Sequence, residues 1–382
     1  MNNFNLTPGT VNIRFGVGAL SELPAILAGL DLKNPFIVTD SGVAASGILD
    51  KVTQSLKNGG FSSSIFNGVK PNPTTTLIDQ GAKAAYEAKA DCIIAVGGGS
   101  SLDSSKGIAL VAANPKFNSA QFNYTITPEH PALPIVAIPT TSGTGSETNN
   151  WGVIDDPNNH KKIYIGDAST TPIAAILDPE LTSGLPPRPT AGTGIDALTH
   201  AIESLTSKGR TPVSAAYAHE AIRLISKALP TAVNDGKNLD ARGDMLMGAH
   251  LAGLALTLSG LGLVHGIAHS VSAHVGAAHG EALAAVLAEV MQFNSANSEA
   301  TTDIYRSVAI DMSVGADAKS AITAVKDLAE EIEIRKPLSF YGVTSDMCEV
   351  IAETALADSV TSNNPIAPSK EQVIELVKSR IN

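Results

Sequence analysis

The sequence contains few cysteines, few aromatic residues and no basic runs, and each of these features excludes a class of protein. Its 382 residues include two cysteines, Cys92 and Cys348, which excludes a disulfide framework and favours a reducing compartment. It contains no run of Lys or Arg, and its net charge of −11 argues against nucleic acid and anionic membranes as partners. Aromatic residues make up only 4%, so we expect a core of Ala, Val, Leu and Ile.

Long apolar runs and targeting signals are also missing. Residues 1–16 have neither a basic start nor an apolar stretch, so they do not resemble a signal peptide. The most apolar segment, 251–264, is shorter than the roughly 18 residues that a membrane span needs, and a histidine follows it. We therefore interpret 251–264 as a buried helix and predict a cytoplasmic protein that does not insert into a membrane.

The two halves of the chain differ in hydrophobic pattern. Up to about residue 187, β-branched runs such as 35–40 and 91–99 alternate with helical segments, which predicts a parallel sheet covered on both faces. A proline cluster at 184–190 interrupts this pattern, and strand-like runs almost vanish beyond it. We predict an α/β nucleotide-binding domain over residues 1–187 and an all-α domain over residues 188–382.

Two loops that follow predicted strands have the features of a phosphate-binding site. In 96–106, three glycines precede a helix that begins near Ser100, with Asp103 and Lys106 in its first turns. The N–H groups at such a helix start favour an anion. In 139–148, six hydroxyl side chains and two glycines can serve phosphate and ribose oxygens. Because both loops lie at the carboxyl ends of parallel strands, we predict that one crevice holds a long phosphate-containing ligand.

A third glycine motif, at residues 16–21, nearly matches the dinucleotide fingerprint but lacks its last glycine. We interpret it as a turn after an N-terminal strand. Asp40 ends the next predicted strand, where a carboxylate can accept hydrogen bonds from the 2′-hydroxyl of the adenosine ribose. It would repel a 2′-phosphate, and no arginine lies beside it in the sequence. Asp40 therefore predicts NAD rather than NADP.

Histidine is concentrated in one segment, which holds four of the nine in the chain: His265, His269, His274 and His279. On a straight helix His265 and His279 would be about 21 Å apart, so sharing one ion requires a bend, for which Gly276 and Gly280 provide breaks. Upstream, Asp196 and His200 are four residues apart on one helical face. Carboxylate and imidazoles without thiolate suit Fe(II), Zn(II), Ni(II) or Co(II). We predict a metal site.

These motifs, in this order, resemble the iron-containing (group III) alcohol dehydrogenases. The matching segments are GGGSSLDSSK, PTTSGTGSE, TGIDALTHAIE, GLGLVHGIAHSVSAHVGAAHG and NNPIAP (363–368). The resemblance covers nearly the whole chain and implies the dehydroquinate synthase-like fold, with a nucleotide-binding α/β domain and a helical metal-binding domain. It also implies an NAD-dependent alcohol dehydrogenase or aldehyde reductase of the lactaldehyde reductase, 1,3-propanediol dehydrogenase or butanol dehydrogenase kind, assembled as a homodimer or higher homo-oligomer.

The resemblance assigns roles to individual residues. It implies four metal ligands: Asp196, His200, His265 and His279. The metal would be Fe²⁺, with Zn²⁺ or another divalent ion as the alternative, and His269 would relay a proton beside it. Besides Asp40, the residues implied to contact NAD are Asn72, Gly98, Gly99, Ser100, Asp103, Thr140, Thr141, Ser142, Thr144 and Lys162. Those implied to line the substrate pocket are Asn149, Trp151 and Leu256.

The implied reaction moves a hydride between a small primary alcohol and nicotinamide while a divalent cation polarises the substrate oxygen. The sequence departs from the family pattern at Leu256, where relatives often have Phe, and at Ile366, where arginine is common. These departures leave the substrate open. Because the amide of Asn149 could bind a second polar group, we expect a short aldehyde with a hydroxyl or acidic substituent rather than a long alkyl chain.

Other activities of the same fold are the alternatives. They include a dehydroquinate synthase-like lyase, glycerol dehydrogenase-like or maleylacetate reductase-like activity, and a non-catalytic NAD-binding protein. The lyase would need several basic residues for a phosphorylated substrate, and the helical half shows no basic cluster. The intact ligand set argues against a non-catalytic protein.

Overall fold

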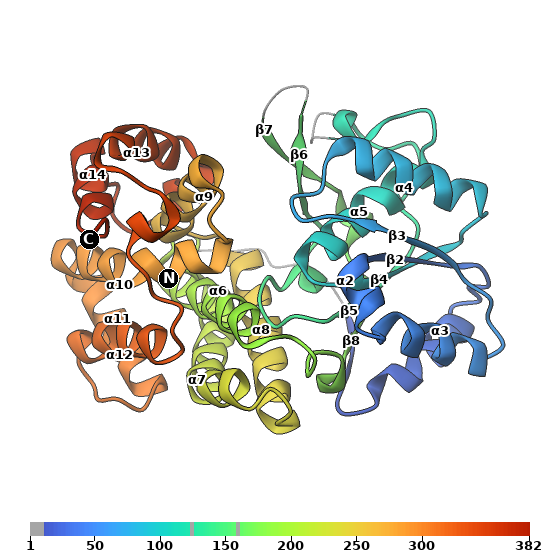
Figure 1. Ribbon diagram of the computed structural model, residues 1–382, viewed down its shortest axis with the longest axis horizontal. Coiled ribbons are helices and arrows are strands. Elements are labelled where there is room, and N and C mark those ends of the chain that lie inside the picture. Colours follow the sequence, from blue (N-terminus) through green and yellow to red (C-terminus); the bar gives the residue numbers. More distant parts are fainter. Residues whose placement is uncertain (1–10, 123–125, 158–160) are drawn as a thin grey trace. The chain divides into compact units, whose positions relative to one another are not determined.

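The computed structural model describes residues 11–122, 126–157 and 161–382. The predicted lack of a signal peptide concerns residues that lie largely outside this part of the chain. Backbone contacts divide the protein into two units, one of Met1–Thr141 with Gly145–Gly184 and one of Ser142–Thr144 with Leu185–Asn382. The first is α/β and the second is helical (Figure 1), which confirms the predicted fold class.

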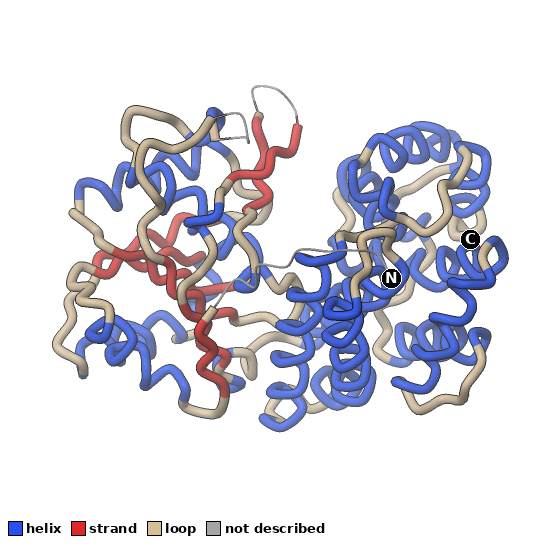
Figure 2. Tube along the Cα trace, turned by 180° about the vertical axis from the view of Figure 1, so that it is seen from behind, coloured by secondary structure: helices blue, strands red, loops and turns tan. Residues whose placement is uncertain are grey.

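A six-stranded parallel sheet organises the first unit, in the order β1-β8-β5-β4-β2-β3. Figure 2 draws the strands of this unit in red among blue helices. Its strands are β1 (Asn12–Phe15), β2 (Pro35–Asp40), β3 (Ser64–Val69), β4 (Cys92–Gly97), β5 (Ile135–Pro139) and β8 (Ala174–Leu177). The strands β6 (Gly152–Asp156) and β7 (Lys161–Ile165) form a separate antiparallel pair. Every pairing in the larger sheet is parallel, as the alternation of strands and helices predicts.

Helices cover both faces of this sheet, so its central strands are apolar along their whole length. In β4, Ile93 packs into one core and the next residue, Ile94, into another on the opposite face. The first core includes side chains of α4 and α5, and the second includes those of α1 and α3. The helices of this unit are α1 (Leu23–Gly29), α2 (Ser41–Ala45), α3 (Ile48–Asn58), α4 (Thr75–Glu87) and α5 (Gly99–Ala113).

The chain reverses its direction of travel across the sheet between β2 and β4. From β2 it continues outward to β3, and then returns to the opposite side of β2 to form β4. In open α/β sheets, ligands bind outside the carboxyl ends of the strands that flank such a reversal. Asp40 ends β2 and Gly97 ends β4, so two of the three predicted phosphate and ribose elements lie at this point.

The second unit is built from helices that follow one another along the chain. They are α6 (Pro187–Thr206), α7 (Pro212–Asn234), α8 (Leu239–Ser259), α9 (Leu263–Val275), α10 (His279–Asn297), α11 (Glu299–Asp311), α12 (Ala318–Glu331), α13 (Cys348–Ala357) and α14 (Lys370–Lys378). The boundary predicted after residue 187 falls at the first residue of α6. One core of small and medium apolar side chains joins these helices.

The interpretation of 251–264 as one buried helix is wrong in one respect. The chain ends α8 at Ser259, where Gly260 adopts a φ of +75°, and starts α9 at Leu263. The two helices meet at 103°. Within the described residues, no single helix has the length and apolar character of a membrane span; α8 and α9 meet that test only when taken together. A glycine with positive φ ends a helix whatever the apolar pattern around it.

The near-fingerprint at residues 16–21 forms a turn, as expected from the missing glycine. Gly18 has a φ of +79°, and its N–H donates to the Asp178 carboxylate at 3.3 Å. The N–H groups of Leu20 and Glu180 donate to the same carboxylate at 3.0 and 3.1 Å. Asp178 is buried, so its charge is stabilised by these three donors. The turn therefore binds a side chain of the protein itself rather than a phosphate.

We predict that Asp178→Ala destabilises the first unit by about 2–4 kcal/mol, because three backbone donors lose their shared acceptor at a buried position. Asp317→Ala is the matched control, since Asp317 caps α12 at an exposed site and its loss should destabilise the protein less. Chemical denaturation measures both. Equal losses for the two variants would contradict the role given to Asp178.

Candidate metal centre and nucleotide-binding loop

Three helices of the second unit bring the predicted metal ligands together. α6 supplies Asp196 and His200, which are four residues apart on a buried face. α9 supplies His265, and His279 is the first residue of α10. Between these helices Gly276 has a φ of +70°, a left-handed conformation that favours glycine. The predicted bend is therefore present at Gly276, whereas Gly280, the other predicted break, lies inside α10.

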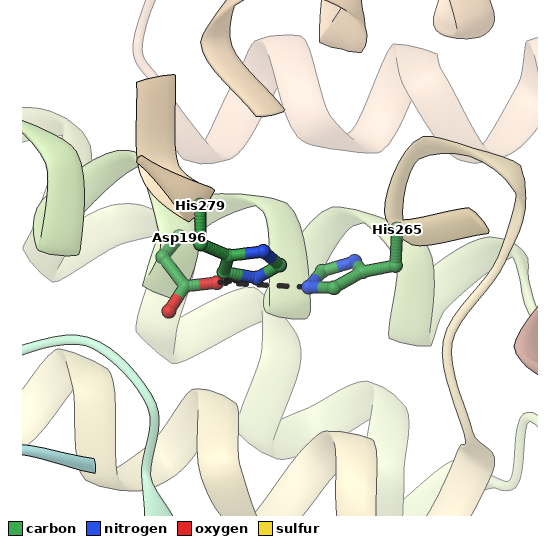
Figure 3. Close-up of side chains that lie close together, drawn as sticks. All are labelled: Asp196, His265 and His279. Carbon is green, nitrogen blue, oxygen red and sulfur yellow. Dashed lines mark ion pairs between the residues drawn. The ribbon is translucent and has the colours of Figure 1, made fainter. Parts of the chain in front are cut away.

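One carboxylate oxygen of Asp196 lies within reach of three imidazoles. Its Oδ1 is 3.2 Å from Nε2 of His200, 3.4 Å from Nε2 of His279 and 3.6 Å from Nε2 of His265. Figure 3 shows His265 and His279 pointing toward this same oxygen. Ligand atoms of Asp196, His265 and His279 all lie within 4.8 Å of one another. The structure thus clusters all four residues that the sequence nominates.

The protonation pattern of this cluster fits a divalent cation. Nδ1 of His265 lies 2.6 Å from Oε2 of Glu203. An ionised carboxylate only accepts, so this Nδ1 carries a hydrogen, and in the neutral form of the ring the lone pair lies on Nε2, facing Asp196. Within the described residues, Oδ1 of Asp196 and Nε2 of His265 are buried without a hydrogen-bond partner. Two facing acceptors in a buried site need a cation or a proton between them.

The electrostatic environment of the predicted ligands differs from that of ordinary surface groups. Burial lowers the pKa of His200 to about 4, which keeps its ring neutral near pH 7. Burial alone would raise the pKa of Asp196, but interactions with His200 and His279 hold it well below its usual range. Burial also opposes the charged form of His265, yet Glu203 and Asp196 raise its pKa to about 9. A proton and a metal cation therefore compete for this ring.

His269 lies beside the cluster rather than in it. Its ring centroid is 5.3 Å from that of His279 and 5.8 Å from that of His265. Its Nδ1 lies 2.7 Å from Oδ2 of Asp358, which leaves Nε2 for another partner. The side chain is 30% exposed, against 1% for His265. Burial lowers the pKa of His269. This arrangement can hold a proton at Nε2 next to the predicted metal ligands.

The close approach of α6 and α10 sets the position of His279. A Cβ added at Gly280 would lie 2.7 Å from the Cα of Gly192 and closer still to its carbonyl group. A Cβ added at Gly192 would meet nothing nearer than 4.0 Å. The contact therefore requires glycine on one side only, directly after a predicted ligand.

The glycine loop of the first unit leads directly into α5. Gly97 has a φ of +145°, and Gly98 is the N-cap of α5 without a side-chain hydrogen bond to the helix start. A Cβ at Gly98 would lie 3.2 Å from Cγ2 of Thr141, so the two predicted loops pack tightly. The uncapped start of a 15-residue helix offers N–H groups and a positive dipole end to an anion.

Asp40 is fixed at the end of β2 beside this helix. Its Oδ1 accepts from the N–H groups of Gly42 and Val43 at 2.8 and 3.0 Å, which caps α2. Its Oδ2 accepts from the Ser101 hydroxyl at 3.1 Å. The carboxylate is therefore ordered across the β2–β4 reversal and remains partly exposed.

The other residues predicted to contact NAD have different surroundings. Thr140 is buried, and its N–H donates to the Gly97 carbonyl at 3.0 Å. Thr140 and Thr141 belong to the first unit, whereas Ser142 and Thr144 belong to the second. Asn72 is exposed and has a φ of +51°, and the exposed Lys162 pairs with Asp155 at 3.0 Å.

Asp103 and Lys106 form a buried network inside the first unit. The Asp103 carboxylate accepts from the Ser146 hydroxyl at 2.5 Å and from the Val153 N–H at 3.0 Å. Nζ of the fully buried Lys106 donates to the Ser146 hydroxyl and to the Asn149 amide oxygen, at 2.7 and 2.9 Å. Burial lowers the pKa of Lys106 to about 8. This network anchors the loop before β6 to α5.

The three predicted pocket residues are distributed over both units. The backbone carbonyl of Trp151 accepts from Nζ of Lys106 at 2.7 Å, and the Trp151 N–H donates to the Asn149 amide oxygen at 3.0 Å. Two internal donors thus share the oxygen of Asn149, which leaves its NH₂ group for other contacts. Leu256 is half-buried on α8, in the other unit. Their role toward a substrate stays a prediction.

Sequence reasoning missed the carboxylates that hold the histidines. Glu203 lies on α6 three residues after His200, inside a motif already singled out, and its helical spacing could have revealed it. Asp358 follows α13, and no spacing rule connects it to His269.

Comparison with known proteins places the whole chain in one family. Residues 10–179 match the family described as "Iron-containing alcohol dehydrogenase", and residues 190–381 match "Fe-containing alcohol dehydrogenase family, C-terminal". The chain is 34% identical to the NAD-dependent methanol dehydrogenase of Bacillus methanolicus over 386 residues, covering 100% of both. It is 35% identical to lactaldehyde reductase of Escherichia coli (strain K12) over 370 residues, covering 95% of this chain and 96% of that protein.

A solved structure of similar sequence has the same fold. The crystal structure of a 1,3-propanediol oxidoreductase superposes with a TM-score of 0.92 at 34% identity, covering 97% of each chain.

The Gly192–Gly280 contact allows a test of whether the packing of α6 against α10 positions His279. We predict that Gly280→Ala destabilises the helical unit by about 1–3 kcal/mol through overpacking and weakens metal binding by displacing His279. Gly192→Ala is the matched control, because its methyl fits and alanine favours a helix, so its stability and metal affinity should equal or exceed those of the wild type. Thermal unfolding with and without added metal measures both. If Gly280→Ala behaves like Gly192→Ala, the contact does not set His279.

Proposed function

This chain belongs to the iron-containing alcohol dehydrogenase family, and from that premise we propose that Asp196, His200, His265 and His279 hold its metal. The protein is a metal-dependent, NAD-dependent oxidoreductase that interconverts alcohols and aldehydes. The observation that carries the ligand assignment is the convergence of three imidazole Nε2 atoms on one buried oxygen of Asp196. Family membership sets aside the lyase and non-catalytic alternatives.

The charge of the donor set suits this chemistry. One carboxylate and three neutral imidazoles bring a single negative charge to a divalent ion, so the occupied site keeps a net positive charge. Bound there, the cation supplies Lewis-acid polarisation of an alcohol or carbonyl oxygen, while the nicotinamide accepts or returns the hydride. Fe²⁺ is the metal that the family name gives, and imidazole and carboxylate ligands also suit Zn²⁺.

We propose that His269 moves the proton that accompanies the hydride. Asp358 accepts from Nδ1–H, which holds the ring in the tautomer whose Nε2 can take up a proton. The ring is partly exposed, so the proton can pass on to solvent. The buried His200 and His265 have no such route.

The nucleotide site proposed here uses the N-terminus of α5 and the end of β2. Gly98, Gly99 and Ser100 offer backbone N–H groups to the pyrophosphate, where no side chain caps the helix. Asp40 lies one strand away with its carboxylate held by three donors. Asn72, Asp103, Thr140, Thr141, Ser142, Thr144 and Lys162 remain proposed NAD contacts on the strength of the motif match.

The substrate we propose is a short aldehyde, or its alcohol, with a second polar group. The support is the NH₂ group of Asn149, whose oxygen Lys106 already holds in place.

We also propose a homodimer. β1 is an edge strand that pairs only with β8 among the described strands, and its Ile13 and Phe15 are 40% and 48% exposed. A reducing, cytoplasmic location is supported by the free thiols of Cys92 and Cys348.

We predict that Asp196→Ala and His265→Ala abolish both stoichiometric metal and turnover, because each removes a ligand from the shared site. His269→Ala should keep the metal and lose about 10²–10⁴-fold in kcat, the usual contribution of a proton-transfer residue. His274→Ala, on the same helix but exposed and bonded to Thr354, is the control that should keep both. Metal analysis measures the occupancy of each variant, and NADH-consumption assays measure its turnover. Full metal occupancy in His265→Ala would refute the ligand set.

We predict that Asp40→Gly relaxes the preference for NAD by at least about tenfold in the ratio of kcat/KM values, because the repulsion toward a 2′-phosphate is lost. Asp40→Asn should shift the ratio as well while keeping an acceptor for the start of α2, which separates the charge effect from loss of the cap. Steady-state kinetics with both cofactors test this. Equal use of NAD and NADP by the wild type would count against the assignment.

A further inference from the structure

Glu203 connects α6 to the beginning of α9. It is 4% exposed, and each of its oxygens accepts a hydrogen bond from α9. Oε1 accepts from the Val264 N–H at 2.7 Å, and Oε2 accepts from Nδ1 of His265 at 2.6 Å. A Cβ added at Gly262 would lie 2.9 Å from Oε1, so a side chain there would displace this carboxylate oxygen. The carboxylate therefore has one position and two fixed partners.

These contacts determine which nitrogen of His265 is free. A neutral imidazole carries its hydrogen on one nitrogen only, and the partner of that nitrogen selects the tautomer. With the carboxylate on Nδ1, the lone pair lies on Nε2, which faces Oδ1 of Asp196. His200 lacks this support, because its Nδ1 is buried without a hydrogen-bond partner among the described residues. His265 is thus a proposed ligand whose tautomer the protein fixes in advance.

We propose that Glu203 is a positioning residue that holds His265 in the Nδ1–H tautomer and so sets the affinity of the site for its metal. The proposal rests on the metal centre proposed above. It concerns a residue that does not itself reach the metal: its two oxygens are engaged by Val264 and His265. Partners of this kind contribute about 10- to 100-fold to metal affinity.

Glu203→Gln isolates the effect because it preserves shape. Its amide oxygen can still accept from Val264, which turns the NH₂ group toward Nδ1 of His265. An NH₂ group donates, so Nδ1 becomes the acceptor and the hydrogen moves to Nε2, where the metal would bind. Asp358→Asn is the matched control. It makes the same chemical change at a carboxylate on Nδ1 of His269, one helical turn further along α9, which we do not count as a ligand.

The experiment measures the Zn²⁺ dissociation constant of the metal-free full-length protein by competition with a chromophoric chelator. Glu203→Gln should weaken Zn²⁺ binding about 10- to 100-fold, and Asp358→Asn should leave it within about twofold of the wild type. Wild-type affinity in Glu203→Gln, or equal weakening in both variants, overturns the proposal. A wild-type protein that binds no Zn²⁺ would instead refute the metal centre itself, so the two failures are distinguishable.

A second measurement covers the case in which Glu203→Gln does not fold. In Zn²⁺-loaded wild-type protein labelled with ¹⁵N-histidine, the imidazole of His265 should show a protonated Nδ1 and a metal-bound Nε2. A metal-bound Nδ1, or an Nδ1 without its proton, overturns the proposal. Circular dichroism and unfolding of the metal-free variants report whether fold and affinity change together or separately.

Discussion

The helical unit depends on one buried negative charge. Asp196 is almost fully removed from solvent, and nitrogen atoms of three imidazoles from three helices lie 3.2, 3.4 and 3.6 Å from its Oδ1. A carboxylate in this position is costly unless a positive charge lies beside it. The helices that supply the nitrogens are held by packing that has little freedom, as the contact between Gly192 and Gly280 shows. Packing thus maintains an arrangement of lone-pair donors that needs a metal cation or a proton among them.

The first unit presents a positive group, the N-terminus of a helix, where the helical unit presents a carboxylate. The glycines after β4 leave the start of α5 without a side-chain cap, while neighbouring helices such as α2 and α4 are capped by Asp40 and Thr74. An uncapped N-terminus is suited to an anion from outside the chain. The buried amine of Lys106 then orders the loop that follows. Each unit therefore leaves unpaired the groups that a cofactor would satisfy.

The sequence predicts those parts of the fold and the site that depend on residues close together in the chain. The parallel sheet follows from apolar runs bounded by glycine, and the cluster of histidines follows from spacing and the need for a bend. The break in 251–264 was missed because Gly260 acts through its backbone conformation, which leaves no mark on the hydrophobic pattern. Lys106 was noticed only as a neighbour of the glycines, since its three acceptors come from the chain some 40 residues later. Asp358 is further still from its histidine, and only tertiary structure joins them.

The separation of the proposed ligands along the chain has a thermodynamic consequence. Asp196 lies on α6 and His279 at the start of α10, with two long helices and α9 between them. A metal that joins them acts as a cross-link across a long loop, and its binding energy is available only to the folded state. Removing the ion would therefore stop catalysis and also lower the free energy of unfolding, because the unfolded chain would regain the conformational entropy that the cross-link restricts. The free energy of unfolding of this unit would therefore depend on the concentration of free metal.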